Sequence, residues 1–304
     1  MNDTPSTLVV INPAAGSGRA AGIWARLRAT AHELFPFDEI TTRGPGDAQR
    51  LARTAAAAGV RRILAVGGDG TLHELVNALA HTPVALGVLP SGTGNDFARS
   101  QGFLGPLPQL LERLAQGVHR PVDLGQAGDT YYLNVAGVGF DADVAKRVNA
   151  LPRKGHGTLP YLGEAVRGAF RFDPPSLELH FDSGDVVGPE RLLLVAVGNA
   201  PAYGGGMRIC PEARVDDGLL DVLVVGDIRG WGTLALLPRV FLGRHLGHPR
   251  IRLFRARRVT VAGPASVTLH ADGEVAGGLP VTFQVHPAAL TLWAPGANVA
   301  AGAR

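Results

Sequence analysis

Hydrophobic residues follow two different patterns along the chain, and the first pattern covers roughly the first 120 residues. There, short apolar runs alternate with segments in which apolar residues recur at the spacing of one helix face, such as Leu72, Leu75, Val76 and Leu79. The pattern predicts strands at 7–11, 38–42, 62–66 and 84–90, with helices between them. Strands that alternate with helices indicate a parallel α/β sheet.

The second pattern begins near Pro121, where glycine, proline and short runs of valine, leucine and threonine dominate. Turn residues separate these runs, which indicates a β sandwich or barrel. The predicted strands are 131–135, 177–181, 191–197, 219–225, 258–262, 266–270 and 281–285, with helical inserts near 161–170 and 230–242. We therefore expect an α/β domain over residues 1–121 and a β-rich domain over 122–289, with residues 290–304 packing back on the first domain.

Composition narrows the class of protein. A hydrophobic content of 46% can fill a sizeable core, and a length of 304 residues favours two domains. The single cysteine, Cys210, excludes an internal disulfide and is expected to be a small buried residue. A net charge of +3 and a pI of about 9.4 allow an anionic partner without requiring nucleic acid. We find no signal sequence and no apolar stretch of roughly 20 residues, and we therefore expect a cytoplasmic protein.

A glycine-rich loop, Gly67–Thr71, follows one apolar strand and precedes a helix. Glycine lets the backbone turn sharply and come close to a ligand, and the free N–H groups at a helix start suit phosphate. Thr71 and Glu74 have the spacing of a capping box, which would mark that start. Taken alone, the loop is equally well explained as an ordinary strand-to-helix turn.

Two further loops of similar composition, Asn12–Arg19 and Ser91–Arg99, follow other predicted strands of this domain. In an open α/β sheet, ligands bind beyond the carboxyl ends of the strands, where all three loops would gather. The first loop lacks the Gly-Lys-Ser/Thr ending of a P-loop. The three loops together predict a nucleotide site; a loop-rich domain without a nucleotide is the alternative.

Two turns of the β-rich domain carry carboxylates. Asp216–Leu219 has the composition of a type I turn or hairpin, and this is the interpretation that the spacing favours. Its carboxylates and carbonyls would also suit Mg²⁺. His270–Glu274 is a second candidate hairpin turn, and its carboxylates, Asp272 and Glu274, could supply a general base. The loop 197–206 follows an apolar strand and is a place for substrate contacts.

Several motifs, taken in order, resemble the diacylglycerol kinase catalytic-domain family, which includes bacterial soluble lipid kinases, sphingosine kinases and ceramide kinases. The resemblance covers nearly the whole chain. It rests on Asn12–Pro13 with Gly16, Gly67–Thr71, Pro90–Phe97, Gly139–Asp141, Gly198–Asn199 with Gly204–Gly206, Pro211 with Asp216–Val222, and Asp272–Glu274. The Gly-Gly-Asp-Gly sequence also occurs in NAD kinases and phosphofructokinases, so the later motifs supply the specificity. The resemblance implies a Rossmann-like α/β nucleotide-binding domain, a C-terminal β-sandwich domain that takes the lipid, and an ATP-dependent lipid kinase.

The resemblance also implies roles for individual residues. ATP would lie over Asn12, Pro13, Ala14, Ala15, Gly16, Thr42, Gly67, Gly68, Asp69, Gly70, Thr71, Thr93, Asn95 and Asp96. Asp69 and Asp96 would orient the phosphates or their Mg²⁺. Asp272 resembles the family's proton acceptor, and Glu274 its close support. Asp217, with the main-chain carbonyls of Arg214 and Leu219, matches the family's structural Mg²⁺ site, and Asp123 matches an aspartate that connects metal and active site.

The chain departs from the family at one position. Some bacterial relatives have a basic residue immediately after the first-loop glycine, where this chain has Ser17. Arg19 is the candidate replacement. Two other functions share part of the pattern: a kinase of the NAD kinase type with a soluble acceptor, and a nucleotide-binding regulatory protein without turnover. The motifs at 90–97 and 216–222 favour a lipid kinase over the first, and the presence of all three catalytic-type aspartates counts against the second.

A lipid acceptor would come from a membrane, and two basic clusters are candidates for attachment to anionic lipid. Each basic residue near a membrane surface contributes about 1 kcal/mol. The clusters are Arg147, Arg153, Lys154 and His156, and Arg250, Arg252, Arg255, Arg257 and Arg258. Solvated loop and strand faces are a slightly better explanation of both. The sequence permits a homodimer and does not say which lipid is the acceptor.

Overall fold

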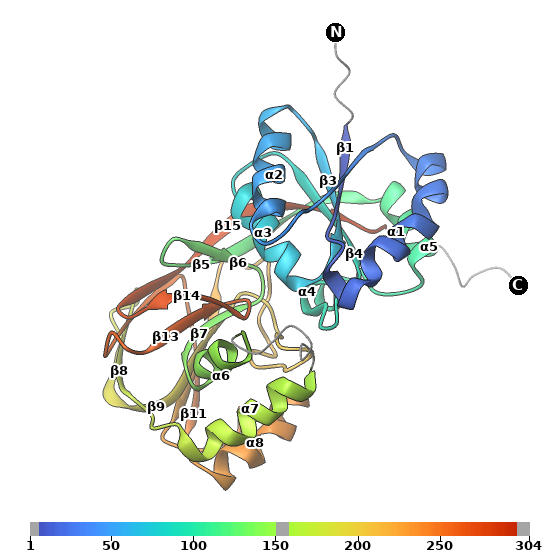
Figure 1. The fold of residues 1–304 in the computed structure, drawn as a ribbon. Helices are drawn as coiled ribbons and strands as arrows, with labels where there is room; N and C mark the ends of the chain where they lie inside the picture. Colours follow the sequence, from blue (N-terminus) through green and yellow to red (C-terminus); the bar gives the residue numbers. More distant parts are fainter. Residues whose placement is uncertain (1–5, 150–157, 297–304) are drawn as a thin grey trace, which may run out of the picture. The chain divides into compact units, whose positions relative to one another are not determined.

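The computed structural model describes residues 6–149 and 158–296 and forms two compact units (Figure 1). The first unit contains the chain up to Val122 and again from Ala288, and the second contains Asp123–Pro287. One is an α/β fold and the other a β sandwich with helices on one face, so the predicted fold class is confirmed.

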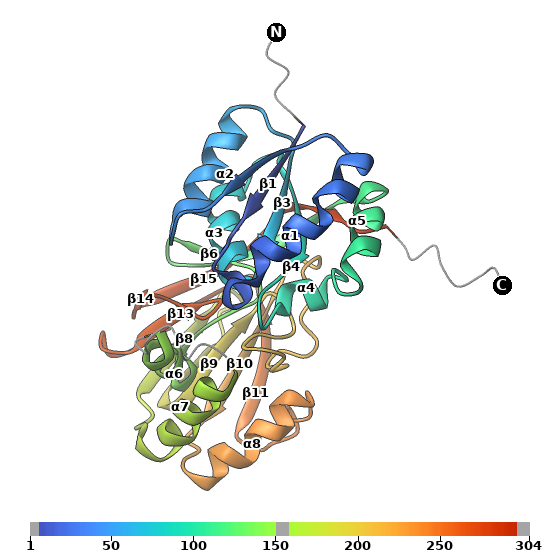
Figure 2. The same ribbon diagram turned by 45° about the vertical axis from the view of Figure 1, so that its right-hand side comes forward.

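A parallel sheet forms the centre of the first unit. Its strands run in the order β2 (Asp38–Thr41), β1 (Thr7–Ile11), β3 (Arg62–Gly67), β4 (Ala85–Pro90) and the end of β15 (Val281–Ala294). The middle strands are buried almost throughout, which explains why their sequences are continuous apolar runs. Figure 2 shows helices on both faces of this sheet, α2 and α3 on one and α1 and α5 on the other.

The helices of the first unit are α1 (Ala15–Leu34), α2 (Asp47–Ala57), α3 (Asp69–Leu79), α4 (Asp96–Ser100) and α5 (Leu107–Ala115). The predicted elements did not include α4, which is too short for its periodicity to stand out, or α5, although Leu107, Leu110, Leu111 and Leu114 have the spacing of one helix face. Trp293 of β15 is buried in this unit, where its Nε1 donates to the Leu114 carbonyl at 2.7 Å. Gly87 leaves room for the indole, since a Cβ there would lie 2.9 Å from it.

The second unit is a sandwich of two mainly antiparallel sheets. One sheet has the order β14 (Glu274–Gly278), β13 (Thr268–Ala271), β7 (Val135–Gly139), β9 (Val186–Gly198), β10 (Leu220–Gly226) and β11 (Ile251–Ala256). The other contains β8 (Ser176–Phe181), β12 (Arg258–Ala262), β15, β5 (Val118–Ala127) and β6 (Thr130–Tyr132). The long strand β9 pairs with β8 through its first half and with β7 and β10 through its second half.

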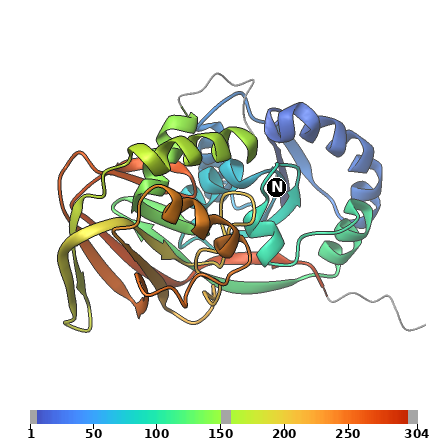
Figure 3. The same ribbon diagram turned by 90° about the horizontal axis from the view of Figure 1, so that it is seen from below.

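Alternate residues of β9 and β10 belong to two different cores. Val195 and Val222 pack between the sheets, whereas Leu194 and Leu223 face the helices. Both faces are therefore buried, and the sequence of these strands is continuously apolar. The helices on the outer face are α6 (Phe140–Asn149), α7 (Thr158–Arg171) and α8 (Trp231–Phe241), which Figure 3 shows from below. Along the described residues, no helix is long and apolar enough to cross a membrane.

One predicted strand of the second unit was wrong. The run 131–135 is divided between β6 and β7, with Leu133 and Asn134 outside both strands. Their N–H groups donate to a side chain, Asp272, instead of to a neighbouring strand. The sequence also failed to predict α6 and β11, and we had interpreted part of β11 only as a cluster of basic residues.

Candidate active site

The three glycine-rich loops of the first unit lie together at the carboxyl ends of β1, β3 and β4. Asn12, directly after β1, donates through Nδ2 to Thr71 Oγ1 in α3 at 2.9 Å. Gly68 and Gly92 approach each other so closely that a Cβ on Gly68 would lie 2.9 Å from the Gly92 Cα. A Cβ on Gly16 would lie 1.9 Å from the Ser91 carbonyl oxygen. The glycines are thus required by the contacts between the loops.

The first loop has an unusual backbone. Gly16, Ser17 and Gly18 have φ values of 60°, 58° and 90°, so the regular part of α1 begins after them. Three successive left-handed residues turn the chain sharply before the helix. Arg19, the candidate replacement for a basic residue at Ser17, donates through Nε to the Gly16 carbonyl at 2.8 Å. In this structure Arg19 therefore stabilises the loop.

Asp69 connects two of the loops. It lies in the first turn of α3, and its carboxylate accepts from the N–H groups of Asp96 and Phe97 at 3.3 and 3.4 Å. Asp96 is buried at the start of α4. Asn95 exchanges two hydrogen bonds with the Gly92 backbone, at 3.0 and 2.9 Å, and so shapes its own loop. The start of α3 therefore faces the group of loops, while the first N–H groups of α4 already bond to Asp69.

The remaining predicted nucleotide contacts differ in exposure. Thr93 is exposed on the third loop, whereas Thr42 is buried after β2 and its N–H donates to the Ile11 carbonyl at 2.9 Å.

The predicted capping box was wrong. Glu74 accepts from the N–H groups of Gly46 and Ala48 at 2.8 and 3.0 Å, and so caps the start of α2. The helix α3 begins three residues earlier than the capping box required, with Gly68 instead of Thr71 at the N-cap.

In the second unit, Asp272 lies in the turn between β13 and β14 with a left-handed φ of 51°. Its carboxylate accepts from three consecutive backbone N–H groups, those of Leu133 and Asn134 at 2.8 Å and Val135 at 3.3 Å. The carboxylate is partly exposed and its direction is fixed by these donors. Glu274 lies two residues further on, exposed at the start of β14.

Asn199 also bonds the segment of Leu133 and Asn134, through their carbonyl groups. The side chain is fully buried and donates through Nδ2 to the carbonyls of Leu133 and Asp123 at 2.8 and 3.1 Å. Its backbone N–H donates to the Asn134 carbonyl at 2.8 Å. Burial raises the pKa of the adjacent Tyr132 phenol, and the charge of Asp272 raises it further. That phenol therefore stays protonated and cannot serve as the base.

Behind the Asp272 turn lies a buried polar group that the motifs alone did not identify as a unit. His270 Nε2 donates to Asp141 Oδ2 at 2.9 Å, and His270 Nδ1 accepts from the Gly273 N–H at 3.3 Å. These two bonds together require the neutral Nε2–H tautomer. The Tyr203 hydroxyl donates to the same Asp141 oxygen at 3.3 Å, and its ring stacks on His270 at 5.4 Å. The three residues come from distant segments, so no local spacing announces them.

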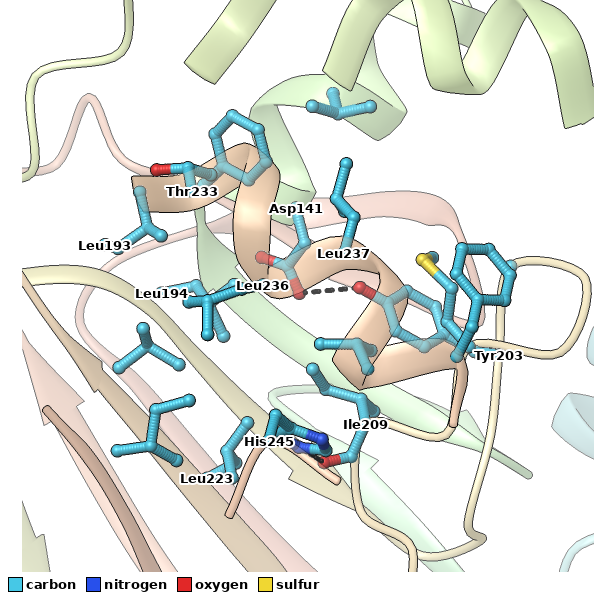
Figure 4. Close-up of a pocket in the computed structure, with 18 residues that line it drawn as sticks. Asp141, Leu193, Leu194, Tyr203, Ile209, Leu223, Thr233, Leu236, Leu237 and His245 are labelled. Carbon is cyan, nitrogen blue, oxygen red and sulfur yellow. Dashed lines mark hydrogen bonds between the residues drawn. The ribbon is translucent and has the colours of Figure 1, made fainter. Parts of the chain in front are cut away.

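An apolar cavity opens beside this group, between α6, α8 and the outer face of β9 and β10 (Figure 4). It measures about 140 Å³. Asp141 and Tyr203 lie at its wall and supply polar atoms, while most of the lining is aliphatic. The lining includes Val144, Leu194, Leu223, Leu236, Leu237 and Val240. Such a cavity fits hydrocarbon with a polar group at one side.

The predicted Mg²⁺ turn is also in the second unit. Asp217 Oδ1 accepts from the Leu219 N–H at 3.1 Å, and its other oxygen pairs with Arg255. Arg255 also reaches Asp221 at 3.1 Å, while Asp123 accepts from the Gly218 N–H at 2.7 Å. Among the described residues there is no group of three or more His, Cys, Asp or Glu side chains that could hold a metal. The predicted Mg²⁺ site uses one carboxylate, Asp217, and the main-chain carbonyls of Arg214 and Leu219; in this structure Asp217 is paired with Arg255, and the site stays a prediction.

Comparisons with known proteins identify the family. Residues 6–127 match the diacylglycerol kinase catalytic domain, and residues 134–294 match the YegS C-terminal NAD kinase beta sandwich-like domain. The chain belongs to the diacylglycerol kinase catalytic-domain family. The prediction of a lipid kinase of this family is thereby confirmed.

Relatives and solved structures agree. The lipid kinase is 33% identical to the diacylglycerol kinase of Mycobacterium tuberculosis over 294 residues, 93% of each chain. It is 37% identical over 269 residues to a protein of Pseudomonas syringae pv. syringae named "Probable lipid kinase YegS-like", covering 86% of this chain and 85% of the relative. A crystal structure of a diacylglycerol kinase from Bacillus anthracis str. Sterne has the same fold. It superposes with a TM-score of 0.75 at 23% identity, covering 98% of this chain and 100% of that chain.

Proposed function

We propose that this lipid kinase transfers the γ-phosphate of ATP to the hydroxyl of a membrane lipid such as diacylglycerol, with Asp272 as general base. One observation carries the proposal. Three backbone N–H groups fix the Asp272 carboxylate on a turn that His270 and Asp141 connect to an apolar cavity. A proton acceptor and a place for hydrocarbon thus occur in the same unit, as a lipid alcohol requires.

The nucleotide is assigned to the three loops of the first unit. Their glycines bring the loops close together, and the start of α3 adds positive dipole density for phosphate. Within this site, Gly16 and Gly67–Thr71 provide main-chain contacts. Asp69 and Asp96 are the proposed contacts of the Mg²⁺ that accompanies ATP. Asn95 and the Thr71 hydroxyl already bond within the loops, so we propose for them a shaping role.

The proposed step balances as follows. The lipid hydroxyl oxygen attacks the γ-phosphorus, the bond from that phosphorus to the bridging oxygen breaks, and ADP leaves. The hydroxyl proton passes to the Asp272 carboxylate. Phosphoryl transfer depends mainly on positioning and charge neutralisation, and base catalysis adds about 10²–10⁴-fold. The His270–Asp141 pair positions the turn that carries the base. His270, held by Asp141, accepts a hydrogen bond from the N–H of Gly273, the residue after Asp272.

The substrate class is tested with purified enzyme, ATP labelled at the γ-phosphate, Mg²⁺ and a panel of acceptors. The panel contains diacylglycerol, a sphingoid base, phosphatidylglycerol and NAD. Label in a lipid product supports the proposal and names the acceptor. Label in NAD alone would instead establish a soluble-acceptor kinase, and nucleotide binding without transfer to any acceptor would establish a regulatory protein.

A further inference from the structure

The helices α7 and α8 of the second unit expose an unusual amount of apolar surface. Of the ten large hydrophobic side chains exposed along the described residues, five lie on these helices or directly after α8. We call this set the α7–α8 ridge; it consists of Val166, Phe170, Trp231, Phe241 and Leu242. Trp231 is 78% exposed and Leu242 is 62% exposed. Exposed apolar side chains that gather on two neighbouring helices mark an interaction surface.

At one end of the ridge, two aromatic side chains, Phe170 and Trp231, pack against each other. The rings of Phe170 and Trp231 meet edge to face, with centroids 5.3 Å apart. Val166 lies one helical turn before Phe170 on the same side of α7. Figure 2 shows the two helices side by side on the outer face of the sheet that contains β9 and β10.

The charge around the ridge is positive. Of the eight arginines between Asp227 and Asp272, Arg229, Arg239 and Arg244 lie on or near α8, and the other five form the second basic cluster. Arg171 ends α7, and Arg239 and Arg244 are exposed at the end of α8 and just after it. The nearby carboxylates Asp173 and Asp227 form ion pairs with Arg191 and Arg229. Aromatic side chains bordered by arginine match the interface of an anionic bilayer, where Trp is enriched.

The basic clusters predicted from the sequence fit this role less well. In the second cluster, Arg252 pairs with Glu190, and Arg255 pairs with Asp217 and Asp221. In the first, Arg153, Lys154 and His156 lie outside the described residues, and Arg147 pairs with Asp143 at 2.9 Å. Among the described residues, the phenylalanine and tryptophan side chains that are exposed, Phe170, Trp231 and Phe241, all belong to the ridge.

We propose that the α7–α8 ridge is the membrane-docking surface of this enzyme, and that its partner is an anionic phospholipid bilayer. The proposal rests on the proposed function, which requires an acceptor from a membrane. The helix α8 has two roles in this arrangement. Leu236, Leu237 and Val240 line the apolar cavity, while Trp231 points to solvent. One helix therefore contacts both the bilayer and the cavity for the acceptor.

Tryptophan fluorescence tests the proposal directly, because the chain has three tryptophans and the other two, Trp24 and Trp293, are 3% and 1% exposed. Vesicles containing phosphatidylglycerol should shift the emission to shorter wavelength in the wild type but not in Trp231→Phe. In sedimentation, Phe170→Ala/Trp231→Ala should weaken vesicle binding about tenfold or more. Val186→Ala, a matched exposed control on β9, should bind as the wild type does.

Several outcomes would overturn the docking surface. They are an absence of vesicle binding by the wild type, unchanged binding of the double variant, or an emission shift that persists in Trp231→Phe. A water-soluble short-chain diacylglycerol separates this proposal from the proposed function. The double variant should phosphorylate it at the wild-type rate, because neither residue lines the cavity. Failure of the wild type to phosphorylate any lipid, with vesicle binding intact, would overturn the proposed function alone.

Discussion

At the scale of single residues, the nucleotide loops depend on positions where no side chain fits. Gly16 combines a left-handed φ of 60° with a carbonyl oxygen 1.9 Å from where its Cβ would be. Gly68 and Gly92 face one another across a gap that admits no further atom. Each glycine thus fixes the distance between two loops, and a single methyl group would separate them.

Gly16→Ala should weaken the binding of a non-hydrolysable ATP analogue at least about tenfold, because the first loop must move away from the third. Gly22→Ala is the matched control in the same helix, since a Cβ there meets nothing within 4 Å. It should bind the analogue normally and be as stable as the wild type or more so. Titration calorimetry measures the affinity of both variants for the analogue, and thermal unfolding measures their stability. Equal affinity of the two variants would show that the loop contact does not shape the nucleotide site.

Among the helices and strands, the sequence pattern predicted those whose structure depends on residues close together in the chain. The buried runs at 7–11, 62–66 and 84–90 are strands, and the glycine loops follow them, because both depend on neighbouring residues. The break between β6 and β7 was not predictable. It exists because Asp272 and Asn199, distant in sequence, take the polar groups of Leu133 and Asn134. The same holds for the contact of Asp141 with His270, which joins residues 129 positions apart.

Arg255 is predicted to supply the positive charge at the Asp217 turn. Arg255→Gln should lower the free energy of unfolding by about 2 kcal/mol, because Asp221 is 2% exposed and loses its charged donor. The control Arg214→Gln, with an exposed partner, should change it by less than about 0.5 kcal/mol. Adding Mg²⁺ or EDTA without nucleotide should leave the wild-type melting temperature unchanged. A clear rise with Mg²⁺ would place a metal at the turn.

His245, between α8 and β11, predicts a dependence of stability on pH. The ring is buried, its Nε2 donates to the Ile209 carbonyl at 2.9 Å, and burial lowers its pKa below the usual 6.5. The unfolded chain therefore takes up a proton first as the pH falls, and stability present above pH 6.5 declines below it. Melting temperatures at pH 7.5 and 5.5 should differ less in His245→Gln than in the wild type. The exposed control His119→Gln should keep the wild-type difference, and an unchanged difference in both variants would contradict the prediction.

At the scale of the whole molecule, the sequence motifs identified the family and the comparisons confirmed it, because the motifs retain their order along nearly the entire chain. The residues that contact each motif from distant parts of the chain were harder to predict. The cavity of the second unit is lined by residues of α6, α8, β9 and β10. These elements are far apart in sequence, so their common cavity could not be predicted from local patterns. Likewise, the pairing of Asp217 with Arg255 joins residues far apart in sequence and could not be predicted from the motif at 216–222.

The central claim, that Asp272 accepts the proton of a lipid hydroxyl, is tested most directly by Asp272→Asn. The change keeps the shape and an acceptor oxygen but removes the base. Transfer of label from ATP to diacylglycerol should fall about 10²–10⁴-fold, with unchanged affinity for the ATP analogue. Glu274→Gln, measured alongside, should lose less. Near-normal transfer by Asp272→Asn, with the fold and nucleotide binding intact, would contradict the account.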